Sequence, residues 1–598
     1  NENVAFKFNG TTDSGEVSSS SVAVVGGSDV EPVAQTNLIL NGGEYFFVFG
    51  GGFGQDVAGD VEVFIGPEAT GSLEIVGGGF RGNVGGSVKL DVNPSEVTRV
   101  IGGSYKGHVE GNTDVYINSR VFLGGVCGGS ARGHVTGSTS LILGNESKVS
   151  FAPTYGGSVN KTVIGWTGGS NTMYYPQVYD TDDNGIGLDD VYVGGSTYVE
   201  FNGTTDQDIY AGGQGPVGSE ANPSGTTLII NGTVNAAYGN TGVFGGGSDG
   251  DIYGDTNVTI GSNAKIERSY TNGGLWGGTI VGGGNRGKVY GDTHVTLNGK
   301  TGSPEYGILV LGGGFTNVSS KTPEVFGTTH ITVNAAPYEC TGDYAFRSFS
   351  GYAGMNSVNG IFGGGFNYAG GESTEILINT DMGAVPVYGG GFLQNSGGDA
   401  EITIAGSVDN VYNGGKNAGI EAGNIGGSST VILTGNGTAK NIYGHEINDN
   451  DGTLSDSVSG TASVVFDSNG TLEQPNNGLN QIVNMDKVTV TNGSHVNLNN
   501  TEDYSQLIHV NDLTVNSGAE LRMEANVLLY GSYTGGSTSE NGGVLGIRPG
   551  KKLIAQGNVS GYTSLDIMET ELLAADLHQI YVASMQGSQN GSFVWVDP

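Results

Sequence analysis

The stretch GGGFRGNV at residues 77–84 recurs as GGSYKGHV at 102–109 and as GGSARGHV at 128–135. The copies begin 25 and 26 residues apart (102 − 77 and 128 − 102). A fixed step in this range is typical of a solenoid, in which each coil buries its apolar face against its neighbours. Further glycine triplets begin at residues 50, 245, 282, 312, 363 and 389.

Short alternating segments lie between the glycine triplets, such as NVTI at 257–260, HVTL at 294–297 and HITV at 330–333. Alternation with a period of two indicates a β-strand with one face turned inward and the other outward. Several such strands and their tight turns fill one step. We therefore predict an all-β fold, a single long right-handed parallel β-helix (β-solenoid) of about 25–26 residues per coil with loop insertions.

The texture of the chain changes near residue 455, where glycine triplets give way to segments such as KVTV at 487–490. The alternation persists there. We predict a glycine-rich parallel β-helix with inserted loops over 1–454, and a C-terminal β-helix continuation and cap over 455–598. Insertions on a rigid repeat carry recognition, so we expect the working face at the inserted coils 144–225, 260–281 and 334–361.

The charge of the chain is strongly acidic. It has 23 Lys and Arg against 59 Asp and Glu, for a net charge of −36. Such a surface repels phosphate backbones, which argues against nucleic acid as a partner. Glycine contributes 112 of the 598 residues but proline only 14, which excludes collagen. The sequence contains no long apolar run, so we expect no membrane span in it.

The glycine-triplet coils and the later coils resemble β-helical repeat regions of bacterial cell-surface proteins of the adhesin and autotransporter-passenger type. They are most similar to glycine-rich regions of wall-anchored proteins of gut Gram-positive bacteria. The resemblance covers most of the chain. It implies a secreted or cell-surface protein whose signal peptide and anchor lie outside this sequence. The partners it implies are host glycans or secreted host glycoproteins of the mucin or immunoglobulin type.

The segment DTDDNGIGLDD at 180–190 places oxygen-bearing side chains at positions 1, 3 and 5 and Gly at position 6. This pattern matches the first half of an EF-hand calcium loop, although position 12 is Val191 instead of Glu. An acidic surface turn is the alternative interpretation. We predict a structural Ca²⁺, and no other cofactor, at Asp180, Asp182, Asn184, the Ile186 carbonyl, Asp189 and Asp190.

An aromatic residue often follows the glycine triplet. Such rings either bind sugars by stacking or form an internal ladder, and internal packing is the favoured interpretation. His108 and His134 also occupy equivalent positions one coil apart, so their rings are expected about 5 Å from each other. The candidate ligand-binding rings are Phe53, Phe80, Tyr105, Phe315, Phe366 and Phe392.

The His-Glu-x-x-His motif does not occur in the sequence, and the Gly-x-Ser-x-Gly spacing is found only inside a glycine repeat, at 246–250, where strands follow instead of the helix that a nucleophile elbow needs. Pairs of carboxylates recur with the repeat, which is typical of polar residues along the solvent-exposed face of a solenoid and not of a single active site. We therefore predict a non-enzymatic extracellular surface protein, an adhesin or a host-factor- or glycan-binding β-solenoid that acts as a rigid binding rod. The alternatives are a carbohydrate-active β-helix enzyme (a polysaccharide lyase or glycosidase) or a phage-type fibre. The carboxylate pairs are Asp56 with Asp60, Glu110 with Asp114, and Asp251 with Asp255.

Overall fold

The chain folds into two compact units, Asn1–Gly327 and Thr328–Pro598. In the ranges that the structure describes there is no helix, and hence none long and apolar enough to cross a membrane. The predicted boundary at 454/455 falls within the second unit. The computed structural model describes residues 4–8, 23–28, 30–159, 191–235, 242–267, 278–304, 307–316, 322–338, 348–349, 352–356, 359–366, 373–392, 396–415, 425–447, 454–455, 458–467, 479–498, 507–538, 542–548, 551–567, 581–584 and 592–595.

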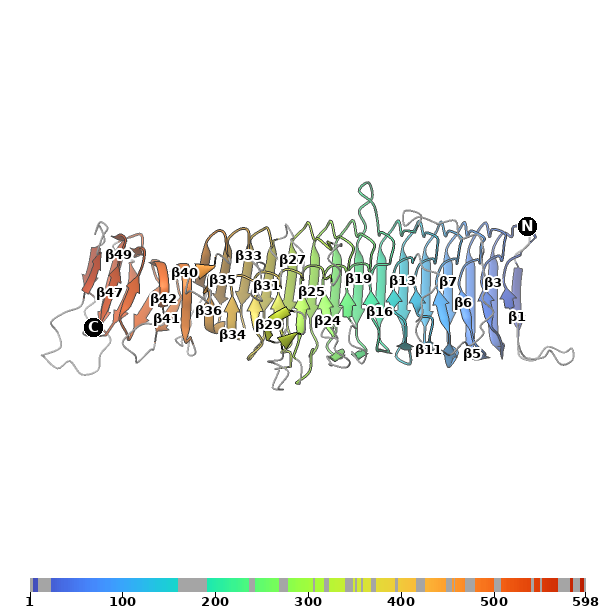
Figure 1. The fold of residues 1–598 in the computed structure, drawn as a ribbon, viewed down its shortest axis with the longest axis horizontal. Helices are drawn as coiled ribbons and strands as arrows, with labels where there is room; N and C mark the ends of the chain where they lie inside the picture. Colours follow the sequence, from blue (N-terminus) through green and yellow to red (C-terminus); the bar gives the residue numbers. More distant parts are fainter. Residues whose placement is uncertain are drawn as a thin grey trace. The chain divides into compact units, whose positions relative to one another are not determined.

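The first unit is a stack of coils whose strands pair in parallel with the equivalent strands of the next coil (Figure 1). The first face is formed by β1 (Val4–Phe8), β3 (Thr36–Glu44), β5 (Val61–Thr70), β7 (Val88–Val92), β10 (Thr113–Ile117), β13 (Thr139–Leu143), β16 (Thr197–Phe201), β19 (Thr226–Ile230), β22 (Thr256–Ile260) and β25 (Thr293–Leu297). The second, shorter face is formed by β8 (Glu96–Val97), β11 (Arg120–Phe122), β14 (Lys148–Ser150), β17 (Thr204–Thr205), β20 (Thr233–Asn235) and β23 (Lys265–Glu267). The third face is formed by β2 (Ala23–Val25), β4 (Phe47–Phe49), β6 (Glu74–Val76), β9 (Arg99–Ile101), β12 (Val126–Cys127), β15 (Thr154–Tyr155), β18 (Ile209–Tyr210), β21 (Gly242–Phe244), β24 (Thr279–Val281) and β26 (Leu309–Leu311).

The register of the strands confirms the predicted all-β parallel β-helix and its step. Thr113 of β10 lies between Val88 of β7 and Thr139 of β13, at steps of 25 and 26 residues. Within β10 the side chains of Thr113, Val115 and Ile117 are buried, whereas the intervening ones are exposed. The pattern of apolar residues therefore sets which side of each strand faces the core.

A column of branched side chains runs through the coils between the glycine turn and the next first-face strand. Each residue makes a single parallel bridge to its equivalent in the next coil, and each is fully buried. Because every coil contributes one such residue, the column ties the third corner of the coil to the core. In the later coils of the first unit it consists of Val193, Val217, Ile252, Val289 and Val325.

A buried threonine closes many of the coils from inside. The Thr256 hydroxyl, at the start of β22, donates to the carbonyl of Gly282 at 2.6 Å. This bond crosses the coil interior and satisfies a carbonyl at the glycine corner, where an unpaired group would be costly. Equivalent bonds of 2.5 to 2.8 Å are made by Thr36, Thr113, Thr139, Thr197, Thr226, Thr293, Thr329 and Thr374.

The first glycine of each triplet is required by the close stacking of the coils. A Cβ atom on Gly245 would overlap the carbonyl oxygen of Gly282 in the next coil, and the same holds for Gly77 and Gly102. Only glycine permits this approach of two backbones. The triplets therefore follow from the coil spacing.

The second unit continues with parallel coils and then changes its strand pattern. Its first face comprises β27 (Thr329–Val333), β31 (Thr374–Ile378), β33 (Ala400–Ile404), β35 (Ser429–Thr434) and β39 (Ala462–Asp467). Its other face comprises β30 (Gly360–Phe362), β32 (Val387–Tyr388), β34 (Ser407–Tyr412) and β36 (Thr438–Tyr443). The later strands are β40 (Gln481–Val490), β41 (His495–Leu498), β42 (Leu507–Val515), β43 (Glu520–Met523), β44 (Val527–Leu529), β45 (Tyr533–Thr534), β46 (Gly543–Ile547), β47 (Lys552–Ala555), β48 (Val559–Ser560), β49 (Tyr562–Ile567), β50 (Tyr581–Ser584) and β51 (Ser592–Trp595).

Strand β40 marks the change in coil geometry. Its first residues pair with β36 and its last residues pair with β39, so one long strand serves two faces. The bend between these two parts lies at Asn484, which has a φ of 55°. His509 in β42 has a similar φ of 51°. The altered texture of the sequence in this region thus corresponds to coils with merged faces.

The predicted inserted coils are largely regular where they are described. Within 144–225 and 260–281 the described residues form ordinary coil strands, β14 to β18 and β23 to β24. The segment 334–361 differs, because β28 (Ser348–Phe349) pairs antiparallel with β29 (Tyr352–Asn356). A second antiparallel pair joins β37 (Glu446–Ile447) and β38 (Leu454–Ser455). Whether these segments form the working face stays a prediction.

Candidate functional site

The predicted calcium ligands Asp180, Asp182, Asn184, Ile186, Asp189 and Asp190 all lie outside the described residues. The predicted carboxylate pairs are described, and several have a role in the turns. Oδ1 of Asp251 accepts the backbone N–H of Lys288 at 2.8 Å, and Oδ1 of Asp255 accepts that of Asp292 at 2.9 Å. Each carboxylate thus caps the turn of the next coil.

The predicted aromatic residues form ladders along the outer side of the third face. Phe80 stacks between Phe53 and Tyr105, at ring-centroid distances of 4.8 and 5.2 Å. Phe366 and Phe392 stack at 5.4 Å. Phe80, Phe315, Phe366 and Phe392 are buried, whereas Phe53 is 38% exposed and Tyr105 is partly exposed. Ligand binding by these rings stays a prediction. Phe53 and Tyr105 are the most accessible of them to a ligand.

The predicted histidine pair does stack. The rings of His108 and His134 lie 3.7 Å apart, and Tyr192 continues the stack at 4.4 Å from His134. The Nδ1 atom of His108 also accepts the backbone N–H of His134 at 3.3 Å. This contact occupies one ring nitrogen of His108, so the pair serves the turn ladder.

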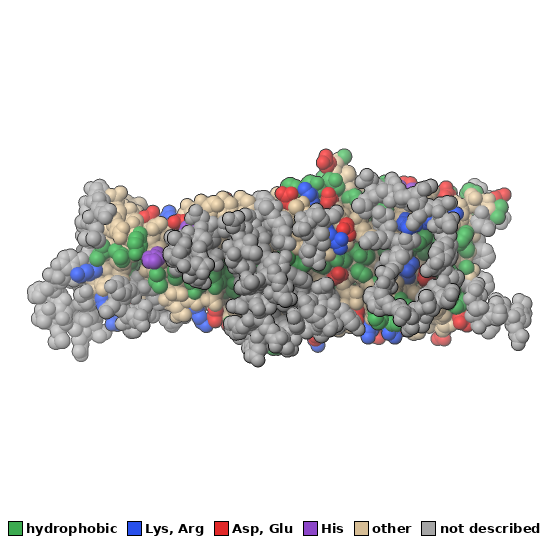
Figure 2. Space-filling view, viewed as in Figure 1, with side chains coloured by type: hydrophobic (Ala, Val, Ile, Leu, Met, Phe, Trp, Pro, Cys, Tyr) green, Lys and Arg blue, Asp and Glu red, His purple; other side chains and the backbone are tan. Residues whose placement is uncertain are grey.

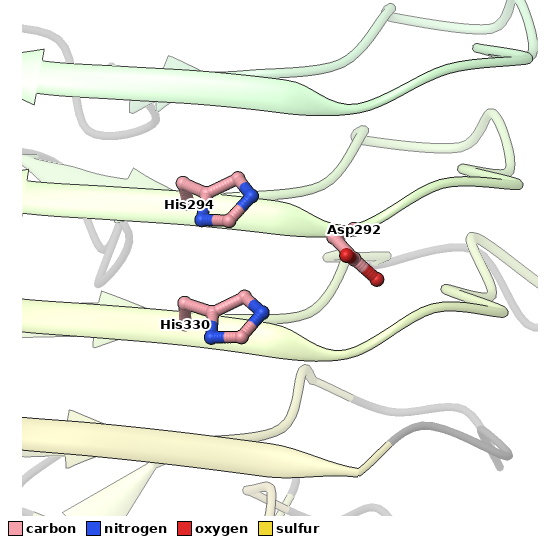
Figure 3. A group of neighbouring side chains, drawn as sticks. All are labelled: Asp292, His294 and His330. Atoms are coloured by element: carbon pink, nitrogen blue, oxygen red, sulfur yellow. The ribbon is translucent and has the colours of Figure 1, made fainter.

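A second group of histidines is shown in Figure 3. The first unit supplies Asp292, in the turn that leads into β25, and His294, on β25 itself. Two ligands do not complete a metal site. The third labelled residue, His330, belongs to β27 of the second unit, where its Nδ1 lies 2.9 Å from Oε2 of Glu375.

The most distinctive site is a polar gap in the aromatic ladder of the first unit. The residue after the glycine turn is aromatic as far as Tyr105 and again at Phe315. After Tyr105 it is first apolar but not aromatic, at Ala131 and Val159, and in the next three coils it is Gln214, Ser248 and Asn285. We call these three residues the polar gap. Because equivalent positions stack one above another, the three polar residues lie next to one another; Ser248 is buried, and Gln214 and Asn285 on either side are partly exposed.

Aromatic rings of the third face form the floor beneath the polar gap. Tyr210 of β18 stacks between Tyr155 of β15 and Phe244 of β21, at 5.2 and 4.8 Å. The three side chains are buried. Gln214 and Ser248 hydrogen-bond the Tyr155 hydroxyl, so the polar gap is tied to the rings below it.

Asp208 lies at the edge of this floor, directly before β18. Its Oδ2 accepts the Tyr210 hydroxyl at 3.0 Å, and its Oδ1 accepts the backbone N–H of Gly242 at 2.7 Å. Burial among the rings raises the pKa of Asp208 to about 6, although these two hydrogen bonds and the charge of Arg286 act in the opposite direction. A carboxyl of this kind can donate or accept a hydrogen bond near neutral pH.

Asn285 and Arg286 bring unused hydrogen-bonding capacity to the polar gap. Nδ2 of Asn285 donates to the Tyr210 hydroxyl at 3.2 Å, but its Oδ1 is buried without a partner. The Arg286 guanidinium pairs with Asp249 at 3.1 Å, while its Nε is buried without a partner. One unpaired acceptor and one unpaired donor thus stand on neighbouring residues. A hydroxyl group could satisfy both, since it accepts one hydrogen bond and donates another.

Sequence reasoning did not find this site. The signal was present in the residue that follows each glycine triplet, because its aromatic character lapses only over part of the chain. Asp208 carried no signal of its own, since its environment depends on rings from three coils.

No known protein family, curated protein or solved structure matches the chain.

Proposed function

We propose that this chain is a non-enzymatic, extracellular surface protein that binds carbohydrate at the polar gap of its first unit. Its partners would be host glycans or secreted host glycoproteins of the mucin or immunoglobulin type, and its location secreted or at the cell surface. This proposal keeps the adhesin-type role that the repeat pattern and its resemblance suggest, and it assigns that role to a specific place.

The observation that carries the proposal is the replacement of aromatic residues by Gln214, Ser248 and Asn285 over a floor of stacked rings. Sugar-binding sites combine apolar surface with a few placed polar groups. Here the polar groups include an acidic side chain, an amide and a guanidinium within three successive coils. Leaving buried atoms of Asn285 and Arg286 unpaired costs stability, which favours a ligand-binding role over a purely structural one.

The test is a glycan array probed with the intact chain and with two carboxamide variants. Asp208→Asn removes an acidic group from the floor of the site and keeps its size. Asp114→Asn is the matched control, because Asp114 is an exposed residue of β10. We expect glycan signals that Asp208→Asn weakens and Asp114→Asn leaves unchanged. Absence of glycan binding, or equal binding by both variants, would contradict the proposal.

A second candidate function, glycoside hydrolysis, has one specific observation in its favour. In the second unit Glu375 of β31 and Glu401 of β33 lie in register on adjacent strands. They line a shallow groove of about 260 Å³ together with His330. Neighbouring strands are about 4.8 Å apart, close to the spacing of about 5 Å between the two carboxyl groups of a retaining glycosidase.

Hydrolysis is tested by incubating the chain with a panel of polysaccharides and measuring new reducing ends. Turnover that disappears in both Glu375→Gln and Glu401→Gln, but persists in Asp208→Asn, would support the groove as an active site. It would also replace the non-enzymatic proposal. Without turnover by the unaltered chain, the binding function stands alone.

A further inference from the structure

An exposed row of aromatic rings lies on the coils of Ser248 and Asn285 and on the coil that follows them. Tyr253 and Tyr290 stack at 4.8 Å, and Tyr290 and Phe326 stack at 5.0 Å, with nearly parallel planes. Tyr290 is 40% exposed and Phe326 is 48% exposed. We call these three residues the aromatic row. It is separate from the buried ladder, because its members follow the column residues Ile252, Val289 and Val325.

Among the described residues of the first unit, the aromatic row is confined to three coils. At the equivalent position the preceding coils carry Gly85, Glu110, Thr136, Gly194 and Gly218. The fold therefore does not need an aromatic residue there, and the buried column alone seals this corner of the coil. Exposed large apolar side chains that gather in one place indicate an interaction surface.

The orientation of the rings restricts what this surface can hold. Because the rings stack along the direction of coil stacking, neighbouring rings cover both faces of Tyr290 and one face each of Tyr253 and Phe326, and the continuous exposed strip consists of ring edges. Stacking of a sugar needs an open ring face. Ring edges instead offer a narrow apolar strip, on which an aliphatic stem can lie.

The surroundings of the aromatic row are acidic. Burial is the main cause that raises the pKa values of Tyr253 and Tyr290, and the charges of Asp251 and Glu220 raise both further, after the effect of Tyr290 in the case of Tyr253. Glu324 precedes the column residue of the last coil. Acidic and basic side chains are scattered among hydrophobic ones over the visible described surface (Figure 2). The acidic charge attracts cations over a long range, and the aromatic row adds an apolar contact at one place.

One residue of the chain already shows how a basic side chain fits here. The Lys288 ammonium lies 5.3 Å from the centre of the Phe326 ring and 3.4 Å from Oε2 of Glu324. It thus contacts an aromatic ring and pairs with a carboxylate at the same time. Further along the aromatic row, Tyr253 and Tyr290 lie beside Asp251 and Glu220, which repeats the two elements of this arrangement for an incoming cation.

We propose that the aromatic row binds an extended, lysine- or arginine-rich segment of a partner protein, with the aliphatic stems on the ring edges and the charged heads at Glu220 and Asp251. The net charge of −36 draws such a segment toward the chain. The ring edges then decide where it settles. The aromatic row is distinct from the polar gap, so this inference does not depend on carbohydrate binding.

The experiment measures fluorescence anisotropy of a labelled peptide of alternating lysine and serine, added to the intact chain. The variant is Tyr253→Ala with Tyr290→Ala, which removes rings without changing charge. Tyr116→Ala is the control, since Tyr116 is a comparably exposed tyrosine on β10, 39% accessible. We expect the double variant to bind at least about tenfold more weakly and the control to bind as the unaltered chain does.

A second peptide separates the apolar contact from the charge. It replaces each lysine by diaminopropionate, which has the same charge on a much shorter stem. We expect it to bind the unaltered chain weakly and to be insensitive to the tyrosine changes. Equal affinities of the double variant and the control, or equal binding of the two peptides, would show non-specific attraction to an acidic surface and overturn the proposal. Glycan binding by the double variant would be retained in either case.

Discussion

The buried threonine at the start of the first-face strands is the residue on which coil closure depends most directly. Its hydroxyl points into the core, where Thr256 pairs with the carbonyl of Gly282 across the coil. The sequence shows threonine at this position in many coils, and β-branching suits it to a strand. Its polar role emerges only from the folded coil, because the partner carbonyl lies 26 residues away.

We predict that Thr256→Val destabilises the protein by about 1–3 kcal/mol, since the change keeps the shape and leaves a buried carbonyl unpaired. Urea unfolding followed by circular dichroism measures the effect. Thr259→Val is the control, because Thr259 lies on the outward side of the same strand. Equal midpoints for the two variants would show that the hydroxyl does not close the coil.

Asp208 should make stability depend on pH in a definite direction. Its pKa is about 6 in the folded protein, against an ordinary value of 3.8. The folded state therefore holds the proton more tightly than the unfolded chain does, so the contribution of Asp208 to stability falls as pH rises from 3.8 to about 6. Above this range the loss is complete.

The comparison of the unaltered chain with Asp208→Asn isolates this effect from the other carboxylates. We predict that the urea midpoint of the unaltered chain declines relative to that of the variant between pH 4 and pH 7. A difference that stays constant over this range would mean that the folded structure does not hold the Asp208 carboxyl in its protonated form.

At the scale of strands and turns, the acidic residues of the coils serve as caps. Oδ1 of Asp399 accepts the backbone N–H of Ser428 at 2.7 Å, one coil further along. The same arrangement recurs at Asp56, Asp60, Asp251 and Asp255. The sequence shows that such carboxylates recur with the repeat. It does not show that they accept hydrogen bonds from backbone N–H groups, because a backbone group leaves no pattern of side chains.

We predict that Asp399→Ala lowers the free energy of unfolding by about 1 kcal/mol, as loss of a capping hydrogen bond does. Asp399→Asn should retain most of the stability, because the amide oxygen can still accept the same N–H. The urea midpoints of the two variants decide the question. If Asp399→Asn lost as much as Asp399→Ala, then charge would matter here and not the cap.

Calcium binding by the acidic segment at 180–190 stays a prediction, and it can be tested separately from the polar gap. If its oxygen atoms hold Ca²⁺, the ion binds the folded state and raises the melting temperature. We predict a rise on adding calcium, no rise with the same concentration of magnesium, and reversal by a chelator. Asp180→Asn combined with Asp182→Asn should abolish the response. A response that survives these changes would place the ion elsewhere.

At the scale of the whole molecule, the fold was predictable and the site was not. The step of 25 or 26 residues, the glycine triplets and the strand alternation all arise from contacts between equivalent residues, so they repeat in the sequence. The polar gap and the aromatic row arise where the repeat is broken, at Asn285 and Tyr290 among others. The role of a residue that departs from the repeat can be inferred only when the structure shows which residues of the neighbouring coils lie beside it.

Carbohydrate binding at the polar gap should protect the backbone of the three coils that form it. The most direct test is amide hydrogen exchange of the intact chain with and without the glycan that binds best on the array. We predict slower exchange at 208–214, 245–250 and 282–287, and unchanged exchange at equivalent turns of the early coils. Protection located elsewhere, with these three segments unaffected in the presence of saturating glycan, would contradict it.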